Sequence, residues 1–88
     1  ASEATYEVRL SVDPAATPLA RERLVDALEA AQYPVSDVQV IEHGDGPVEL
    51  VAILVSTAVS ADELDAVVAR LQRQPGVVHA NWEVSTRD

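Results

Sequence analysis

The stretch from Val48 to Thr57 would be apolar on both faces if it formed an extended strand, and this feature constrains the fold most strongly. Successive side chains of a strand point to opposite sides of the sheet. The two predicted faces are Leu50, Ala52 and Leu54 on one side and Val51, Ile53 and Val55 on the other. Such a strand is typical of the centre of a sheet, with its second face at least partly covered. In 88 residues with 48% hydrophobic side chains, one core can form around it.

Two other stretches alternate between apolar and polar residues, which is the pattern of a half-buried strand. One runs from Thr5 to Val12 and the other from Val77 to Ser85. In the second, the predicted faces are Val78, Ala80, Trp82 and Val84 on one side and His79, Asn81 and Glu83 on the other. The β-branched stretch Val35 to Glu42 predicts a fourth strand, which the turn-forming residues His43 to Pro47 join to the central one.

Two segments show the apolar spacing of three and four residues that amphipathic helices have. The first is predicted to start at Thr17-Pro18, with Thr17 as the N-cap and Pro18 at the first helical position. It ends at Tyr33-Pro34, because the residue before a proline avoids the helical region. The second starts at the capping box Ser60 to Glu63 and closes at Pro75-Gly76.

The predicted order of elements is therefore β-α-β-β-α-β. With right-handed crossovers, this order gives an α+β ferredoxin-like sandwich, in which a four-stranded sheet of order 4-1-3-2 carries both helices on one face. We expect the first and third strands to lie parallel in the centre, with the second and fourth antiparallel beside them. Residues 5–86 form this single domain, and residues 1–4 are predicted to be a linker or a disordered N-terminus.

Charge and composition limit the partners. The chain has 15 acidic and 6 basic side chains, no lysine, and a formal charge of −9. Nucleic acids and anionic lipids are bound through clustered lysine and arginine, so neither is an expected partner. Without cysteine, disulfides and thiolate metal sites are excluded. We expect no membrane span, since the longest uncharged run, Leu50 to Ala61, is too short, and no signal peptide.

Few residues suggest chemistry. Glu42, His43 and Asp45 could ligate a metal, or could simply face water at a turn, and a stable site would need further ligands. His79 could respond to pH near neutrality or be an ordinary solvated histidine. Trp82 could anchor the core or face a partner. The serines lack the flanking pattern of a nucleophile, so we predict no enzyme, no cofactor, no metal site and no tightly bound small molecule.

The element order, with Asp13-Pro14 just after the first strand, resembles the ACT domain family. That family consists of small regulatory domains that bind amino acids or related effectors and often pair through their sheets. Its first strand-to-helix loop usually carries a glycine, in a run like Asp-x-Pro-Gly-x-Leu. The corresponding loop here, from Asp13 to Leu19, has Ala15 and Ala16 instead.

The segment from Leu71 to Trp82, with a helix end, a Pro-Gly turn, a valine-rich strand and a tryptophan, resembles the tail of the MgtC/SapB family. Tyr6 to Leu10 and the leucine-spaced helix that follows are similar to the same family's soluble C-terminal portion, and the likeness extends over about Tyr6 to Glu83. The resemblance implies an ACT-like cytoplasmic domain of a protein anchored in the bacterial inner or plasma membrane. It also implies a regulatory role in adaptation to low magnesium and in survival inside phagocytes, which is a virulence function.

The alternative is an effector-binding ACT domain of another protein that senses an amino acid or a cation. In either case we expect the sheet surface away from the helices to make the contacts. The candidate interaction face consists of Leu50, Ala52, Leu54, His79 and Asn81. The partner is predicted to be a second copy or the membrane part of the parent protein. Because like charges repel, the isolated domain should be a monomer, or a dimer no tighter than about micromolar.

Overall fold

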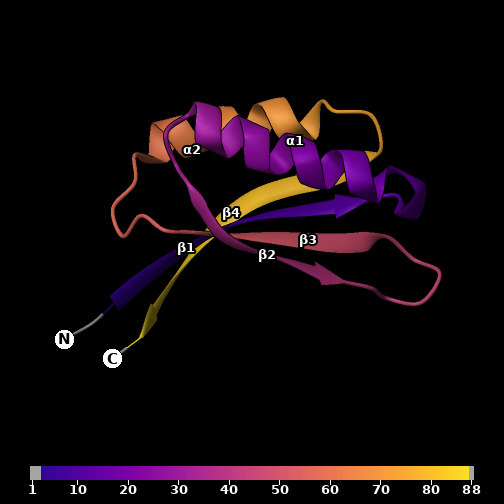
Figure 1. Ribbon diagram of the computed structural model, residues 1–88, viewed down its shortest axis with the longest axis horizontal. Helices are drawn as coiled ribbons and strands as arrows, with labels where there is room; N and C mark the ends of the chain where they lie inside the picture. The colour runs from indigo at the N-terminus through magenta and orange to yellow at the C-terminus, as the bar shows by residue number, and fades with distance from the viewer. Residues whose placement is uncertain (1–2, 88) are drawn as a thin grey trace.

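Two helices cover one face of a four-stranded sheet in the computed structural model, which describes residues 3–87 (Figure 1). The elements are, in chain order, β1 (Glu3–Val12), a short 3-10 turn (Pro14–Ala16), α1 (Thr17–Ala30), β2 (Val35–Ile41), β3 (Val48–Leu54), α2 (Ala61–Gln72) and β4 (Val77–Arg87). The order β-α-β-β-α-β and the ferredoxin-like α+β fold are thereby confirmed. Of the segment 1–4 that was predicted to be a linker, residues 3 and 4 belong to β1 and residues 1 and 2 lie outside the described residues.

The strand order is β2-β3-β1-β4, as predicted, but every neighbouring pair is antiparallel. The expectation that the first and third strands lie parallel is therefore wrong. The helical crossover makes β1 parallel to β2, which is not its neighbour in the sheet. The tight turn after β2 then reverses the chain, so β3 enters the space beside β1 in the opposite direction.

The core lies between the sheet and the helices. Its fully buried side chains come from both layers, and the largest of them are Leu10, Leu24, Leu28, Leu50, Leu64, Leu71, Val8 and Val12. The alternation in β1 and the helical spacing in α1 and α2 place these residues on facing surfaces. Burial of their apolar area, at roughly 25 cal/mol per Å², is the main favourable contribution to folding.

Helix α1 starts and ends differently from the prediction. The residues from Pro14 to Ala16 form a 3-10 turn, so Ala16 is the N-cap residue and Thr17 is already helical. The Thr17 hydroxyl instead donates to the Asp13 carbonyl at 3.3 Å. At the other end, Gln32 has φ = 69°, and the Tyr33 N–H donates to the Leu28 carbonyl at 2.8 Å. This is a Schellman ending in which glutamine takes the left-handed position that glycine usually fills.

The predicted capping box of α2 forms, but the Tyr33 hydroxyl lies between its two residues. The Ser60 hydroxyl accepts from the Glu63 N–H at 3.4 Å, as expected. The reciprocal bond is replaced by the Tyr33 hydroxyl, which accepts from the Ser60 N–H at 3.0 Å and donates to a Glu63 carboxylate oxygen at 2.5 Å. The hydrogen bond to Glu63 raises the pKa of Tyr33 above its usual value. The end of α1 is thereby bonded to the start of α2.

Strand β4 contains a bulge and a protected edge. The register against β1 shifts between His79 and Val77, so Val78 is the extra residue and is exposed, although the alternation placed it with the core. The Gln72 side chain donates to the Val78 carbonyl at 3.1 Å and accepts from the Ala80 N–H at 2.8 Å. A side chain thus occupies backbone groups that an incoming strand would use.

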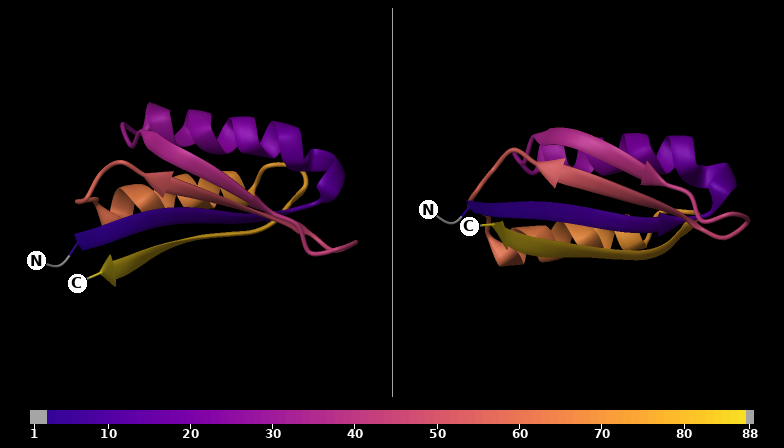
Figure 2. Two further views of the ribbon diagram at one scale, coloured as in Figure 1. Left: turned by 60° about the horizontal axis from the view of Figure 1, so that its bottom comes forward. Right: turned by 90° about the horizontal axis from the view of Figure 1, so that it is seen from below.

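Viewed from below, neither α1 nor α2 lies over the second sheet surface (Figure 2). We call it the outer face. Strands β1 and β4 pair from Glu3 and Arg87 inward, whereas β3 pairs only with residues 7–12 of β1. The paired ends of β1 and β4, at Glu3 and Arg87, therefore extend beyond the rest of the sheet (Figure 1).

Candidate interaction surface

The outer face is built from residues that the strand registers place in rows across the sheet. In the middle row, Arg9 of β1 lies between Val51 of β3 and Asn81 of β4. The flanking rows are Ser11 with Glu49 and His79 on one side, and Glu7 with Ile53 and Glu83 on the other. Strand β2 adds Asp37, Gln39 and Ile41 at the far edge. Side chains opposite one another across strands are close enough to interact.

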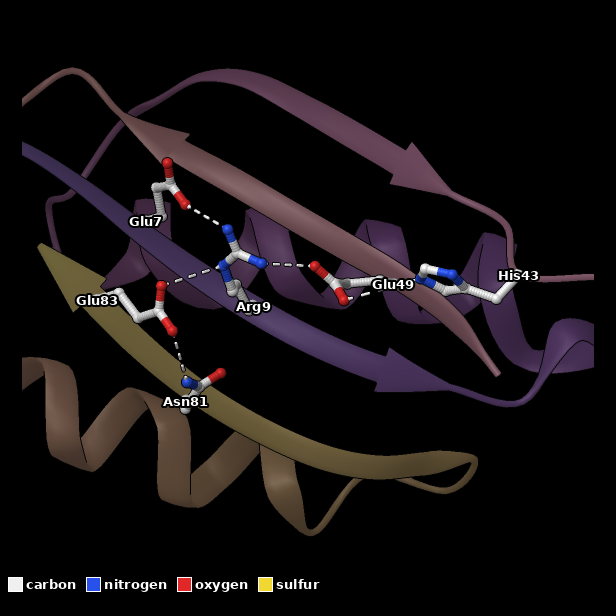
Figure 3. Close-up of polar contacts among 6 residues, drawn as sticks. All are labelled: Glu7, Arg9, His43, Glu49, Asn81 and Glu83. Carbon is white, nitrogen blue, oxygen red and sulfur yellow. Dashed lines mark hydrogen bonds and ion pairs between the residues drawn. The ribbon is translucent and has the colours of Figure 1, made fainter. Parts of the chain in front are cut away.

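Arg9 lies at the centre of this face and contacts three glutamates from three strands (Figure 3). Its Nη1 lies 2.6 Å from Glu49 Oε1, its Nη2 lies 3.1 Å from Glu7 Oε2, and its Nε lies 3.5 Å from Glu83 Oε2. Asn81 also contacts Glu83, with 3.5 Å between its Nδ2 and Oε1. One cation thus holds together three carboxylates that would otherwise repel one another.

The neighbouring glutamates keep Arg9 in its protonated, positively charged form. Desolvation alone would lower the pKa of Arg9. The hydrogen bond to Glu7 and the negative charges of the neighbouring glutamates outweigh desolvation, so the pKa lies above the usual value for arginine. The Nε atom is buried and makes no hydrogen bond within the described part of the chain. Arg9 therefore remains a cation at any physiological pH, and its charge is used within the cluster.

Arg9 also lies beside the apolar part of β3. Val51 points to the outer face opposite Arg9, yet it is only 2% exposed. The long aliphatic part of an arginine commonly shields apolar surface in this way. Beside the cluster is a hollow of about 230 Å³, lined by Arg9, Ser11, Glu49, His79, Asn81 and Glu83. The outer face is therefore polar and shallow over β1 and β4, and it has little exposed aliphatic surface over β3.

The structure divides the candidate interaction face. Leu50, Ala52 and Leu54 are buried in the core beneath the helices, so they are not available to a partner and this part of the prediction is wrong. The sequence showed two apolar faces on β3, and only the pairing with β1 decides which one is covered: Leu50 lies opposite Leu10, and Val51 opposite Arg9. His79 and Asn81 do lie on the outer face.

Sequence reasoning missed the Arg9 cluster. Glu7 and Arg9 stand two residues apart, so they share a strand face, but Glu49 and Glu83 come from distant segments. Their meeting depends on the antiparallel pairing of β1 with both β3 and β4, and the predicted parallel direction of β3 did not provide it.

The other residues considered for chemistry are at the surface. Glu42, His43 and Asp45 are exposed at the turn between β2 and β3, and His43 Nε2 lies 4.0 Å from Glu49 Oε2. Among the described residues, no group of three or more histidine, cysteine, aspartate or glutamate side chains could hold a metal ion. Trp82 lies on the side of the sheet that the helices cover. It packs against the core there, and its Nε1–H donates to Asp65 Oδ1 of α2 at 2.8 Å.

The loop after β1 is closed by its neighbour. The Asp13 N–H donates to the Gly76 carbonyl at 2.9 Å. Gly76 has φ = 84°, and a Cβ placed on it would lie 2.4 Å from the Ala16 Cβ. The Ala16 side chain therefore lies directly against the backbone of Gly76, which packs the loop against the turn after α2.

Comparison with known proteins agrees with this architecture. The family model for the MGTC/SAPB C-terminal domain matches residues 6–82. The solution structure of the C-terminal domain of the MgtC protein from Mycobacterium tuberculosis is 25% identical, with a TM-score of 0.81, and the match covers 94% of this chain and 88% of that one. No match was found among curated protein sequences.

Two further structures share the fold at lower identity. The de novo designed protein Foldit4 is 16% identical with a TM-score of 0.61, over 98% of this chain and 97% of that one. LarC2, the C-terminal domain of a cyclometallase involved in the synthesis of the NPN cofactor of lactate racemase, is 15% identical with a TM-score of 0.56. That match covers 100% of this chain and 58% of the LarC2 chain. Within residues 3–87, neither helix is long and apolar enough to cross a bilayer.

Proposed function

Because the chain belongs to the MGTC/SAPB C-terminal domain family, we propose that it is a regulatory or interaction domain, without catalysis of its own, of an MgtC-like bacterial membrane protein. The observation that carries the proposal is the outer face: one whole side of the sheet is uncovered and displays a pre-arranged set of charges around Arg9. The membrane part of the parent protein is the proposed location of transport or signalling, and this domain lies on the cytoplasmic side of the inner or plasma membrane.

The chemistry of the outer face supports a binding role. Acid–base catalysis relies on groups whose pKa values are displaced and whose hydrogen bonds are left free for substrate. Here the glutamates are engaged by Arg9, and the hollow beside them is shallow and open. We extend the proposal to the parent protein's physiology: this domain adjusts a membrane protein that serves adaptation to low magnesium and survival inside host cells.

An effector-binding role like that of ACT domains is less well supported. Such a role needs room for a small molecule beside the loop that follows β1. In this chain the loop is hydrogen-bonded to the Gly76 carbonyl, and the Ala16 side chain of the loop packs directly against Gly76. We therefore expect free amino acids to bind weakly or not at all.

Pairing of two copies through the outer face is also poorly supported for the isolated domain. Among residues 4–86, the face has four carboxylates (Glu7, Asp37, Glu49 and Glu83) against one guanidinium, so two copies would place like charges together. Val51 is only 2% exposed, which leaves little apolar area to bury. We propose that the isolated domain is a monomer, or a dimer no tighter than about micromolar, and that any closer pairing needs the effective concentration that tethering supplies.

The test uses the full parent gene in a bacterium that lacks its own copy. Three versions are compared for growth in limiting magnesium: the whole protein, the protein without this domain, and the whole protein with Arg9→Glu. We expect the version without the domain to restore growth poorly although it reaches the membrane in equal amount, and Arg9→Glu to fall between the two. Full restoration of growth without the domain would overturn the proposal. The charge-matched control is Arg21→Glu, at an exposed residue of α1.

A further inference from the structure

We infer that the outer face docks a cationic polypeptide segment that carries lysine or arginine beside aliphatic residues. This inference rests on the proposed interaction role and names the chemistry of the partner. Three features carry it: neither helix lies over this face, carboxylates are in excess around Arg9, and two isoleucines, Ile41 of β2 and Ile53 of β3, are partly exposed among them.

The cluster around Arg9 has more negative than positive charge, and its side chains are held by ion pairs. Arg9 is shared among three glutamates, so its single positive charge leaves an excess of negative charge. Glu83 is 54% exposed and Glu49 is 31% exposed, so both carboxylates can take further donors without leaving Arg9. Because Arg9 holds these carboxylates in place, a partner's ammonium or guanidinium group would meet acceptors that need little ordering.

Two partly exposed isoleucines supply the aliphatic part of the surface. Ile53 lies next to Glu7 in the register, and Ile41 lies next to Glu49 and is 38% exposed. Acidic and aliphatic side chains are therefore interspersed on this part of the sheet. A segment that carries both basic and aliphatic side chains is complementary to this mixture, whereas a purely cationic ligand would meet only the carboxylates.

The negative charge of the outer face argues against three other kinds of partner. A second copy would present the same acidic rows, and nucleic acids and anionic lipids would present phosphates, so all three would be repelled. The chain as a whole, at −9, favours encounter with a cationic partner and disfavours the others.

The probe is an acetylated and amidated peptide of alternating lysine and valine, added to the isotope-labelled 88-residue chain and followed by NMR. We expect saturable shifts that concentrate at outer-face residues such as Arg9, Val51 and Asn81, with affinity that falls as salt rises. A lysine–glycine peptide should bind more weakly, and a glutamate–valine peptide should not bind. Equal binding of the two lysine peptides would overturn the aliphatic half of the inference.

Two charge-matched variants locate the site. Glu49→Gln with Glu83→Gln removes two charges from the outer face, and Glu22→Gln with Glu29→Gln removes two exposed charges from α1. We expect the first pair to weaken binding about five- to twentyfold and the second pair by less than about twofold, since exposed ion pairs contribute modestly and locally. Equal weakening by both pairs would mean diffuse attraction and would overturn the docking site.

A second variant guards against a folding defect in the first. Asn81→Lys places a cation within reach of Glu83 and should compete with the peptide, which raises the dissociation constant while the helix-layer signals stay unchanged. Unchanged affinity in this variant would contradict the inference. If deletion of the domain still impairs growth while these binding tests fail, the interaction role stands and the cationic partner is wrong.

Discussion

The same strands form both faces of the sheet, but one face forms the core and the other is open to contact. Along β1, Val8, Leu10 and Val12 pack under the helices, while Glu7, Arg9 and Ser11 alternate with them on the outer face. The covered face contributes stability by burying apolar side chains. The outer face holds its charges in a network that contributes little to stability and remains open to contact.

Neighbouring residues on β3 make this contrast sharp. Leu50 and Val51 are both almost fully buried, at 0% and 2% exposure. Leu50 is enclosed by closely packed core side chains, whereas Val51 lies on the outer face between the long side chains of Arg9 and Gln39. Two equally buried side chains therefore need not contribute equally to the free energy of unfolding. The cost of truncating a side chain depends on how far the groups that surround it can move into the space left behind.

The largest expected effect tests this contrast directly. Leu50→Ala should lower the free energy of unfolding by about 2–5 kcal/mol, because the packed core cannot close the cavity. Val51→Ala should cost only about 1 kcal/mol, because Arg9 can settle onto the smaller side chain. Urea denaturation followed by Trp82 fluorescence measures both. Similar losses for the two variants would show that the outer face is packed as tightly as the core.

The turn after α2 should come next in size. Gly76→Ala should cost about 1–3 kcal/mol, because Gly76 has a positive φ and its added Cβ would meet Ala16. Gly44→Ala is the control: Gly44 also has a positive φ but open space around it, so about 1 kcal/mol is expected. In an Ala16→Gly background, Gly76→Ala should lose only the backbone part of its cost. If Ala16→Gly brings no relief, the close approach does not hold the two loops together.

On the outer face, Arg9→Gln should cost about 1 kcal/mol, because three glutamates then lie together without their cation. Added salt should shrink the loss, since it screens the repulsion between the carboxylates. Thermal unfolding at low and high salt checks both statements, with the exposed Arg21→Gln as control. A loss as large as that of Leu50→Ala would erase the contrast between the faces.

The smallest effect concerns the helix layer and pH. The hydrogen bond to Glu63 raises the pKa of Tyr33 in the folded state, so its stabilising contribution is fully present below the tyrosine pKa of the unfolded chain. It is lost as the pH rises through the higher folded pKa. In a Tyr6→Phe background, absorbance of the tyrosinate should show Tyr33 ionising at lower pH when Glu63→Gln is introduced. Glu49→Gln, on the outer face, should leave this titration unchanged.

Most of the fold could be predicted from local patterns. Alternation in Thr5 to Val12 and the Ser60 to Glu63 cap located β1 and α2, because these signals depend on near neighbours in the chain. The start of α1 was misplaced because Pro14 to Ala16 form a turn that already begins the helical path before Thr17. The direction of β3 relative to β1 required the reversal after β2 to be followed through the whole sheet.

The candidate site was harder, for a physical reason. His79 and Asn81 could be assigned to the outer face because β4 has a polar and an apolar side. Strand β3 has no such asymmetry around Leu50 and Val51, so its orientation is set by long-range pairing and not by its own sequence. The Arg9 cluster depends on the same pairing.

The paired ends of β1 and β4 have a mechanical consequence. Glu3 lies opposite Arg87, and the two strands run antiparallel from that point into the sheet. If the two ends were pulled apart, the tension would act along the hydrogen bonds between these strands and open them one pair at a time, as a zipper opens. The domain would therefore yield to a weak pull across its ends, and β1 would be peeled from β4 before the force reached the packed helices.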